Sequence, residues 1–391
     1  MLRKLISHSQ DLRRLWDEGY EIEVKDNHLL IHHVPYLNAS AEINYGSLVS
    51  TLHLAADATL KPDTHKAYFI GDAPCDKSGQ VISAILHSST TKQLSPSIVV
   101  QHMFSSKPAG GYSDYFEKMT TYINIISAPA KSVDESVMAR TFKVVEPLTT
   151  DSPFHYIDTN STRAQIDSVT AKLAGQVVAL VGLGGTGSYV LDLVAKTPVK
   201  EIHLYDGDIL KSHNAFRAPG AASVEVLRER INKAVYFAGI YSKMHRHIVP
   251  HDYYVDKSSI GELSRFDFVF LNVDNGSVRK EVVQFLQNNN IPFVDTGMGL
   301  QNIENELIGI VRVTTSTQHK NDHVAKHAPV VEELENEYAT NIQIADLNAL
   351  SATLAVIKWK KLSGFYNDLE REHNSTYSIN VNMLTSSDYA A

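Results

Sequence analysis

The stretch VVALVGLGGTGSYVLDLVAK, residues 177–196, restricts the possible folds of this chain more than any other. A nearly uninterrupted apolar run, rich in valine, leads into a cluster of glycines, and an apolar pattern with helical spacing follows. Such a run is typical of a strand buried on both faces, as in a parallel sheet covered by helices. The unit recurs in FDFVFLNVDN, VRKEVVQFLQ and IPFVDTG, so the sequence predicts a doubly wound, mostly parallel, Rossmann-like α/β domain.

The glycine cluster matches the pattern GxGxxG through Gly182, Gly184 and Gly187, with Gly185 inside it. Glycines let backbone N–H groups approach a phosphate, and the start of the following helix adds partial positive charge. Asp206 ends the next predicted strand, where a carboxylate can bind ribose hydroxyls. The pattern predicts adenine nucleotide binding, but by itself it leaves open a dinucleotide, ATP, or a packing turn without a ligand.

Charged and amide side chains gather after this strand. YDGDILKSHNAFRAPG adds Asp208, Asn214 and Arg217, RINKAV adds Lys233, and Asp274 ends the strand FVFLNVD. A redox enzyme that holds a dinucleotide needs no such cluster, whereas a site that neutralises a triphosphate does. Asp274 suits Mg²⁺, which prefers a few carboxylates together with phosphate oxygens and water. We therefore expect ATP and Mg²⁺ rather than NAD.

The motifs GLGGTGS, YDGD followed by HNAFR, the lysine of RINKAV, and VDNGSVR occur in this order. They resemble the successive motifs of the adenylyltransferases that activate ubiquitin and related carriers, including those of thiamine and molybdopterin biosynthesis. The resemblance covers residues 163–364. It implies that the C-terminal carboxylate of a ubiquitin-like protein attacks the α-phosphate of ATP, which releases pyrophosphate and leaves an acyl adenylate.

The resemblance also implies a role for each matching residue. Asp206 binds the ribose, Asp274 coordinates Mg²⁺, and Arg163 stands where the family places an arginine that reaches the ATP of a partner subunit, although its spacing to the glycine loop is shorter. Because one chain would then hold an incomplete site, we expect a homodimer. The remaining residues expected to bind the nucleotide are Gly182, Gly184, Gly185, Gly187, Asp208, Asn214, Arg217, Lys233 and Asn275.

The second half of the chain departs from this family because it contains no cysteine. Related enzymes that pass the carrier on usually present a cysteine after the last core strands, and many bind zinc through CxxC pairs. Three routes remain open: an oxyester on Thr340 or on one of Thr314 to Thr317, direct attack on the adenylate by a partner, or transfer to Cys75, the single cysteine. Direct attack is favoured, since a hydroxyl is a poor nucleophile without a base.

His319, His323 and His327 recur every four residues, so a helix would place them on one face. Three imidazoles can bind Zn²⁺, and one can act as a base for a threonine hydroxyl. A solvated histidine face is the favoured interpretation. Residues 342–359 also have apolar side chains at helical spacing, which predicts a helix in the core or at a dimer interface.

Residues 1–155 predict a separate α+β domain, and residues 160–391 the ATP-binding domain, with the polar stretch 151–163 as the linker. EIEVKDNHLLIHHV predicts a hairpin that turns at Asp26-Asn27, and AYFIGD and QVISAIL predict short strands. HHVPYLN and YFIGDAPCDKSGQ are similar to a bacterial domain of unassigned role that is fused ahead of adenylating domains. The similarity implies a bacterial ubiquitin-like pathway, in which this domain recruits the carrier or a conjugating enzyme.

Bulk properties exclude several other classes. The 391 residues carry a net charge of −8, which argues against a general nucleic-acid binder, and the sequence lacks both a long apolar span and a signal-peptide pattern. We expect a cytoplasmic protein with a polar C-terminal tail. Adenylation of a small carboxylate, a peptide or a tRNA base, and a non-catalytic ATP-binding scaffold, remain the alternatives; an NAD-dependent dehydrogenase is the least favoured.

Overall fold

The structure is a computed structural model that describes residues 5–6, 8–56, 58–143, 152–156, 158–164, 166–327 and 342–390. The chain divides into two compact units, the first comprising Met1–Ser152 with Tyr156–Ala171 and the second Pro153–His155 with Lys172–Ala391. Among the described helices, none is both long and apolar enough to cross a bilayer.

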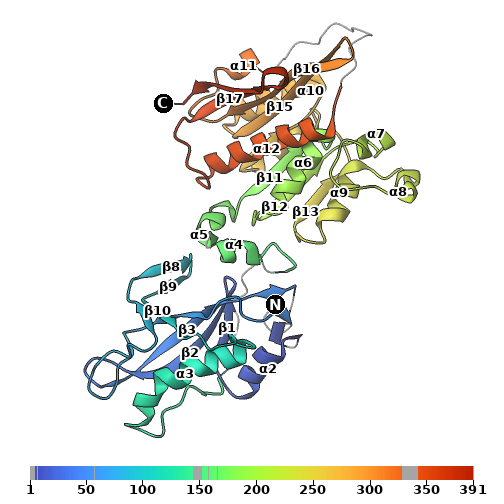
Figure 1. Cartoon of the computed structure of the whole chain (residues 1–391). Helices are drawn as coiled ribbons and strands as arrows, with labels where there is room; N and C mark the ends of the chain where they lie inside the picture. Colours follow the sequence, from blue (N-terminus) through green and yellow to red (C-terminus); the bar gives the residue numbers. More distant parts are fainter. Residues whose placement is uncertain are drawn as a thin grey trace. The chain divides into compact units, whose positions relative to one another are not determined.

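The first unit is built on a six-stranded antiparallel sheet in the order β1-β2-β3-β6-β10-β7. Helix α3 lies against β2 and β3, and α2 packs beside α3 (Figure 1). This confirms the predicted separate α+β domain. The elements are α2 (Gln10–Asp17), β1 (Ile22–Lys25), β2 (His28–Leu37), β3 (Ile43–Thr51), β4 (Leu54–Ala55), β5 (Ala58–Thr59), β6 (Lys66–Ile70), β7 (Leu86–Ser88), β8 (Lys92–Ser95), β9 (Ile98–Val100), β10 (His102–Ser105), α3 (Tyr115–Lys131), α4 (Thr159–Ala164) and α5 (Asp167–Thr170).

Turn chemistry explains one success and one error in this unit. Asp26 and Asn27 have φ angles of 45° and 60° and join β1 to β2, as the two positive-φ residues of a tight hairpin should. QVISAIL is not a strand: β7 begins at Leu86, and the preceding residues form turns that direct Ile85 into the core. The backbone N–H groups of Ile85 and Leu86 both turn back to the carbonyl of Ile82, so the β propensity of these residues did not decide their conformation. Helix α4 also begins inside the stretch expected to be a linker.

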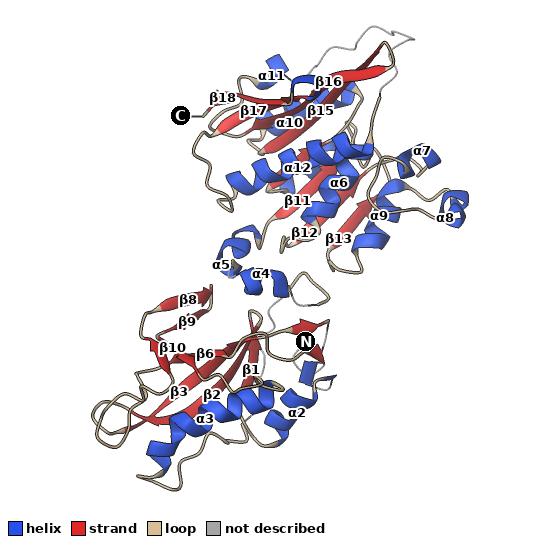
Figure 2. Cartoon of the chain, viewed as in Figure 1, coloured by secondary structure: helices blue, strands red, loops and turns tan. Residues whose placement is uncertain are grey.

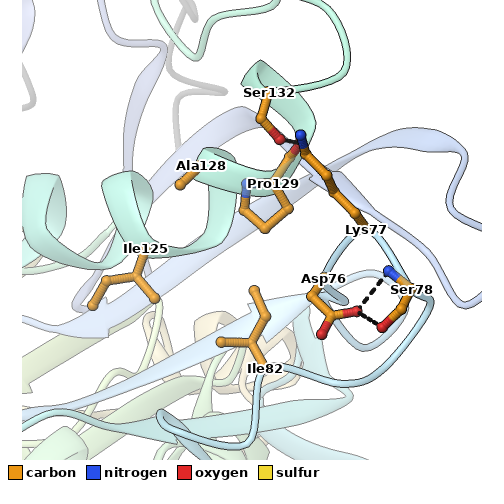
Figure 3. A pocket seen from close by; sticks show the side chains of 8 residues that line it. All are labelled: Asp76, Lys77, Ser78, Ile82, Ile125, Ala128, Pro129 and Ser132. Carbon is orange, nitrogen blue, oxygen red and sulfur yellow. Dashed lines mark hydrogen bonds between the residues drawn. The ribbon is translucent and has the colours of Figure 1, made fainter.

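Figure 3 shows a hollow of about 560 Å³ on this unit, between the C-terminal half of α3 and the loop of residues 76–82. Ile82, Ile125 and Pro129 supply apolar surface. Asp76 accepts hydrogen bonds from the backbone N–H (2.8 Å) and the hydroxyl (2.6 Å) of Ser78, which closes the loop. The polar side chains at the rim are exposed, so the hollow does not specify a ligand.

A lysine lies inside the core of the first unit. Lys118, on α3, is fully buried and donates hydrogen bonds to Oγ of Ser50 (2.8 Å) and to the carbonyl of Thr64 (2.9 Å). Burial disfavours the ammonium form and lowers the pKa of Lys118 to about 7. Above that pH an unfolded chain still binds the proton and the folded chain does not.

Stability of the first unit should therefore rise with pH between about 7 and 9, by up to about 1.4 kcal/mol per pH unit from this group. Lys118→Met should flatten that dependence. Urea unfolding followed by Trp16 fluorescence measures it, in a Trp359→Phe background that leaves Trp16 as the single tryptophan of the chain. An equally steep rise in the Lys118→Met protein would contradict the assignment.

The second unit contains an eight-stranded sheet in the order β13-β12-β11-β14-β15-β16-β17-β18. The first five strands are parallel and the last three are added antiparallel (Figure 2). The strands are β11 (Val177–Val181), β12 (Glu201–Tyr205), β13 (Ile248–His251), β14 (Phe268–Leu271), β15 (Phe293–Ile303), β16 (Glu306–Ser316), β17 (Glu372–Ser378) and β18 (Met383–Tyr389). The helices are η1 (Ala171–Leu173), α6 (Gly185–Val194), α7 (Ser212–Ala215), α8 (Val224–Glu229), α9 (Lys233–Tyr241), η2 (Ile260–Arg265), α10 (Gly276–Asn288), α11 (Val324–His327), α12 (Ala345–Leu362) and η3 (Ile379–Val381).

Helices cover both faces of the parallel strands. Side chains of α6, α9 and α12 pack with Leu180 and Phe270 in one apolar cluster, and α10 and η2 pack with Val181 and Leu271 in another. This confirms the doubly wound α/β prediction. The strand order reverses between β11 and β14, and in such sheets ligands bind beyond the carboxyl ends of the strands at this switch point.

The prediction of a polar C-terminal tail is wrong. Residues 372–389 form β17 and β18, which extend the sheet. The buried residues of β17 are Glu372, His373 and Asn374 rather than apolar ones, so alternating hydrophobicity gave no strand signal. Main-chain pairing with β16 holds the strand in place.

The three histidines do not share a helix face. His319 lies in a turn after β16, His323 precedes the short helix α11 and is buried, and His327 pairs with Asp388 at 2.7 Å. Thr317 and Lys320 pair with each other and close a tight turn around His319, and α11 begins only at Val324. In the part of the chain that the structure describes, no group of three metal-ligating side chains is found.

Candidate functional site

The glycine loop connects β11 to α6 at the switch point. Gly182 has a φ of 90°, and a Cβ there would lie 2.6 Å from the carbonyl oxygen of Asn272. A Cβ on Gly187 would lie 1.9 Å from the carbonyl oxygen of Gly182. Helix α6 therefore begins directly against the end of β11, and only glycines permit this approach. Its first N–H groups and partial positive charge face the site.

Asn348 of α12 fills the space beside the loop. A Cβ on Gly185 would lie 2.0 Å from Nδ2 of Asn348, which is completely buried. Asn348 accepts a hydrogen bond from Thr186 (3.0 Å) and donates one to the carbonyl of Arg217 (3.4 Å). It thereby joins the glycine loop to the segment that carries Arg217. Sequence reasoning did not single it out, although an asparagine within an apolar helical pattern was a usable signal.

Asp206 follows β12 and braces the loop. Its two oxygens accept hydrogen bonds from the backbone N–H groups of Leu183 (2.7 Å) and Asp208 (2.8 Å). It is 6% exposed, and burial raises its pKa against the opposing effect of Lys233, 3.8 Å away. Asp206 lies where a ribose carboxylate is expected, and its contact with ribose stays a prediction.

Lys233 begins α9 and lies 2.7 Å from Asp208. Asp208 also accepts a hydrogen bond from the hydroxyl of Tyr254, and this bond is the main reason why the pKa of Tyr254 rises to about 12. The charges of Asp206 and Asp274 act on the same hydroxyl in the same direction. Asp208 therefore contacts both Lys233 and Tyr254, and Lys233 also lies 3.8 Å from Asp206.

Two buried donors at this site have no hydrogen-bond partner. Oδ1 of Asn214 accepts from the backbone N–H of Lys211 (2.9 Å), but its Nδ2 is unpaired, as is Nε of Arg217. Buried donors are normally satisfied, so the unpaired ones indicate a missing acceptor. Phosphate oxygens are acceptors of this kind, so the glycine cradle and these donors fit a polyphosphate.

The remaining predicted residues differ in how they are placed. Asp274 is exposed just after β14. Oδ1 of Asn275 caps α10 through the backbone N–H groups of Ser277 (3.0 Å) and Val278 (3.1 Å), so this oxygen has a structural task. Thr340 and the side chain of Arg163 lie outside the described part of the chain.

The other candidate acyl acceptors also differ. Thr314, Thr315 and Ser316 are buried, whereas Thr317 is partly exposed and its Oγ1 lies 3.0 Å from Nε2 of His373. Nδ1 of His373 lies 2.9 Å from the carbonyl of Arg371, which can only accept, so Nε2 is left to accept the Thr317 proton. Burial lowers the pKa of His373 and keeps it neutral.

Thr317 and Cys75 lie in different surroundings. Thr317 lines a hollow of about 630 Å³ with Gln176 and Trp359, at the edge of the sheet opposite the glycine loop. Cys75 is buried in the first unit, and burial raises the pKa of its thiol. A raised thiol pKa leaves little of the nucleophilic thiolate at neutral pH.

A family model described as the ThiF family matches residues 160–385. The chain belongs to the ThiF family. This confirms the predicted resemblance, and ThiF membership supports ATP-dependent adenylation of a substrate carboxylate. A second model, described as a domain of unknown function (DUF6791), matches residues 10–159, in agreement with the expected domain of unassigned role.

Solved structures with a similar fold include E. coli MccB with succinimide, which is 17% identical over 59% of this chain and 70% of that one, with a TM-score of 0.48. E. coli MccB with AMPCPP and MccA is 15% identical over 71% and 83% of the two chains, with a TM-score of 0.48. PaaA is 15% identical over 56% and 75%, with a TM-score of 0.42. A search of curated proteins returned no match.

Gly187→Ala should lower nucleotide affinity at least about tenfold, since the new methyl group forces α6 away from the loop. Gly239→Ala is the matched control: Gly239 lies within α9, and a Cβ there meets nothing within 4 Å. Titration with a fluorescent ATP analogue measures both. Equal affinities of the two variants would contradict a role for the loop in nucleotide binding.

Proposed function

We propose that this ThiF-family chain adenylates the C-terminal carboxylate of a ubiquitin-like protein, with ATP as co-substrate and Mg²⁺ bound at Asp274. The observation that carries the proposal is the meeting of the glycine loop, Lys233 and the unpaired donors of Asn214 and Arg217 at one switch point. The diphosphate of a dinucleotide carries less negative charge than the triphosphate of ATP, and it would offer fewer oxygens to pair with these donors.

In this proposal the carboxylate oxygen attacks the α-phosphorus of ATP, the bond to the bridging oxygen breaks, and pyrophosphate leaves. Lys233 and Arg217 stabilise the charge that builds up on the phosphates, and Asp206 holds the ribose end. Mg²⁺, when bound, neutralises phosphate charge. Because the carboxylate is already a nucleophile, the protein contributes alignment and electrostatics rather than covalent chemistry.

The first unit would recruit the carrier or a conjugating enzyme in the cytoplasm, and a second copy of the chain would supply Arg163. The residues matched by the ThiF model contain no cysteine. The adenylate would therefore be attacked directly by a partner, or its acyl group would pass to a threonine hydroxyl. Thr340 lies outside the described residues, and Thr317 has a base, His373, within hydrogen-bond distance.

Asp274→Ala should reduce carrier-dependent ATP–pyrophosphate exchange at least about 100-fold, because a carboxylate ligand of Mg²⁺ is lost. Glu370→Ala is the control, because it removes an exposed carboxylate just before β17, at the opposite end of the sheet from the glycine loop. The carrier would be a ubiquitin-like protein ending in an exposed glycine, compared with the same protein lacking that residue. Exchange without any carrier would favour a small carboxylate substrate, and ATP binding without exchange would favour a scaffold.

Intact mass spectrometry after incubation with carrier, ATP and Mg²⁺ separates the two fates of the adenylate. An oxyester on Thr317 should add the mass of the carrier less that of one water molecule, survive neutral hydroxylamine, disappear in mild base, and be absent from the Thr317→Val protein. Loss of His373 in His373→Gln should slow its formation about 10²- to 10⁴-fold. An unmodified chain that still supports exchange would favour direct transfer to a partner.

A further inference from the structure

Three charged side chains form a buried cluster beside the switch point. Asp295 of β15 is completely buried, and Nη2 of Arg312, on β16, donates a hydrogen bond of 2.6 Å to its Oδ2. Nε of Arg279, on α10, lies 3.1 Å from its Oδ1 and forms an ion pair without hydrogen-bond geometry. The arginine side chains are 10% and 11% exposed. We refer to these three residues as the buried triad.

The buried triad lies at the same edge of the sheet as the glycine loop. Asp295 is in register with Leu271 of β14, which is in register with Val181, the last residue of β11. The sheet therefore brings the triad to the level where the nucleotide is expected, two strands away from the glycine loop.

Arg279 links the triad to the loop that bears Asp274. Its Nη2 donates a hydrogen bond to the carbonyl of Val273, the residue before Asp274. On the other side, Asn275 caps α10. The backbone on both sides of Asp274 is thus fixed, although its own carboxylate is exposed.

Other residues hold the outer arginine in place. A Cβ on Gly297 would lie 2.6 Å from Nη2 of Arg312, so the glycine leaves room for the guanidinium. Arg312 donates to the hydroxyl of Thr314, which donates in turn to Asn374 of β17 at 2.7 Å. The network therefore runs from β17 through the triad to the Asp274 loop.

A buried ion cluster adds little to the free energy of unfolding, because removing charges from water is costly. Apolar side chains of the same size would stabilise the core equally well. What the cluster supplies is a fixed geometry for the groups it holds. We propose that Arg279 is a positioning residue that orients the Asp274 loop for a divalent cation, with Asp295 and Arg312 orienting Arg279. The inference rests on the proposed function, since the metal role of Asp274 comes from there.

The test compares Arg279→Gln with Lys358→Gln in the full chain. Lys358 is also a buried cation held by two carboxylates, Asp368 at 2.9 Å and Glu372 at 3.7 Å, but it has no contact with the Asp274 loop. Binding of Mn²⁺ in the presence of α,β-methylene ATP is followed by electron paramagnetic resonance. Hydrogen–deuterium exchange of residues 273–279 is followed without any ligand.

Arg279→Gln should weaken Mn²⁺ binding about tenfold and speed exchange in residues 273–279, whereas Lys358→Gln should change neither. Arg312→Lys, which keeps the charge but not the two-point contact, should act in the same direction to a smaller extent. It also serves as the second variant if Arg279→Gln does not fold.

The results distinguish a failure of the positioning role of Arg279 from a failure of the metal role of Asp274. The positioning role would be refuted if Arg279→Gln left both Mn²⁺ binding and loop exchange unchanged while Asp274→Ala abolished Mn²⁺ binding. Where Arg279→Gln does not fold, the same result in Arg312→Lys would refute it. Either result would leave the proposed function intact. Unchanged Mn²⁺ binding in Asp274→Ala would instead refute the metal assignment on which both depend. Equal weakening in Arg279→Gln and Lys358→Gln would show a general effect of lost stability and also refute the positioning role.

Discussion

The contact on which the site depends is the approach of Gly187 to the carbonyl oxygen of Gly182, where even a methyl group would lie at 1.9 Å. Because α6 begins so close to β11, its free N–H groups open at the switch point of the sheet. Asp206 fixes the intervening backbone through Leu183, and Asn348 fills the next gap. Without this contact, the loop would not present its N–H groups to a phosphate, and the charged residues beside it would have no binding site to complete.

Near the glycine loop, carboxylates pair with the cationic side chain that is expected to bind phosphate. Lys233 is almost fully buried and bound to Asp208, whose side chain is half exposed. A triphosphate arriving at the loop would compete with Asp208 for Lys233, while the donors of Asn214 and Arg217 are already unpaired. A cation that is already buried and paired with a half-exposed carboxylate loses less on ligand binding than one that must first be desolvated.

The sequence predicted those features that depend on residues adjacent to one another along the chain. The Asp26-Asn27 hairpin and the turn at Gly182 follow from local φ preferences, and their prediction needed no tertiary information. The buried triad was missed because its members lie on three different elements: strand register brings Arg312 to Asp295, and the packing of α10 brings Arg279 there. Strand β17 was missed for a related reason: its buried residues are polar, and their partners lie on other elements, as Lys361 of α12 does for Glu372 and Thr314 of β16 for Asn374.

The position of Thr317 bears on how an adenylate would be used. Antiparallel pairing makes β16 run back from the glycine-loop edge, so the Thr317–His373 pair lies at the opposite edge of the sheet. An acyl group formed at the loop would have to cross the full height of the sheet to reach this hydroxyl within one unit. Attack by a partner that enters at the loop edge needs no such movement. Direct transfer is therefore the more economical route, and an oxyester on Thr317 requires a rearrangement or a second copy of the chain.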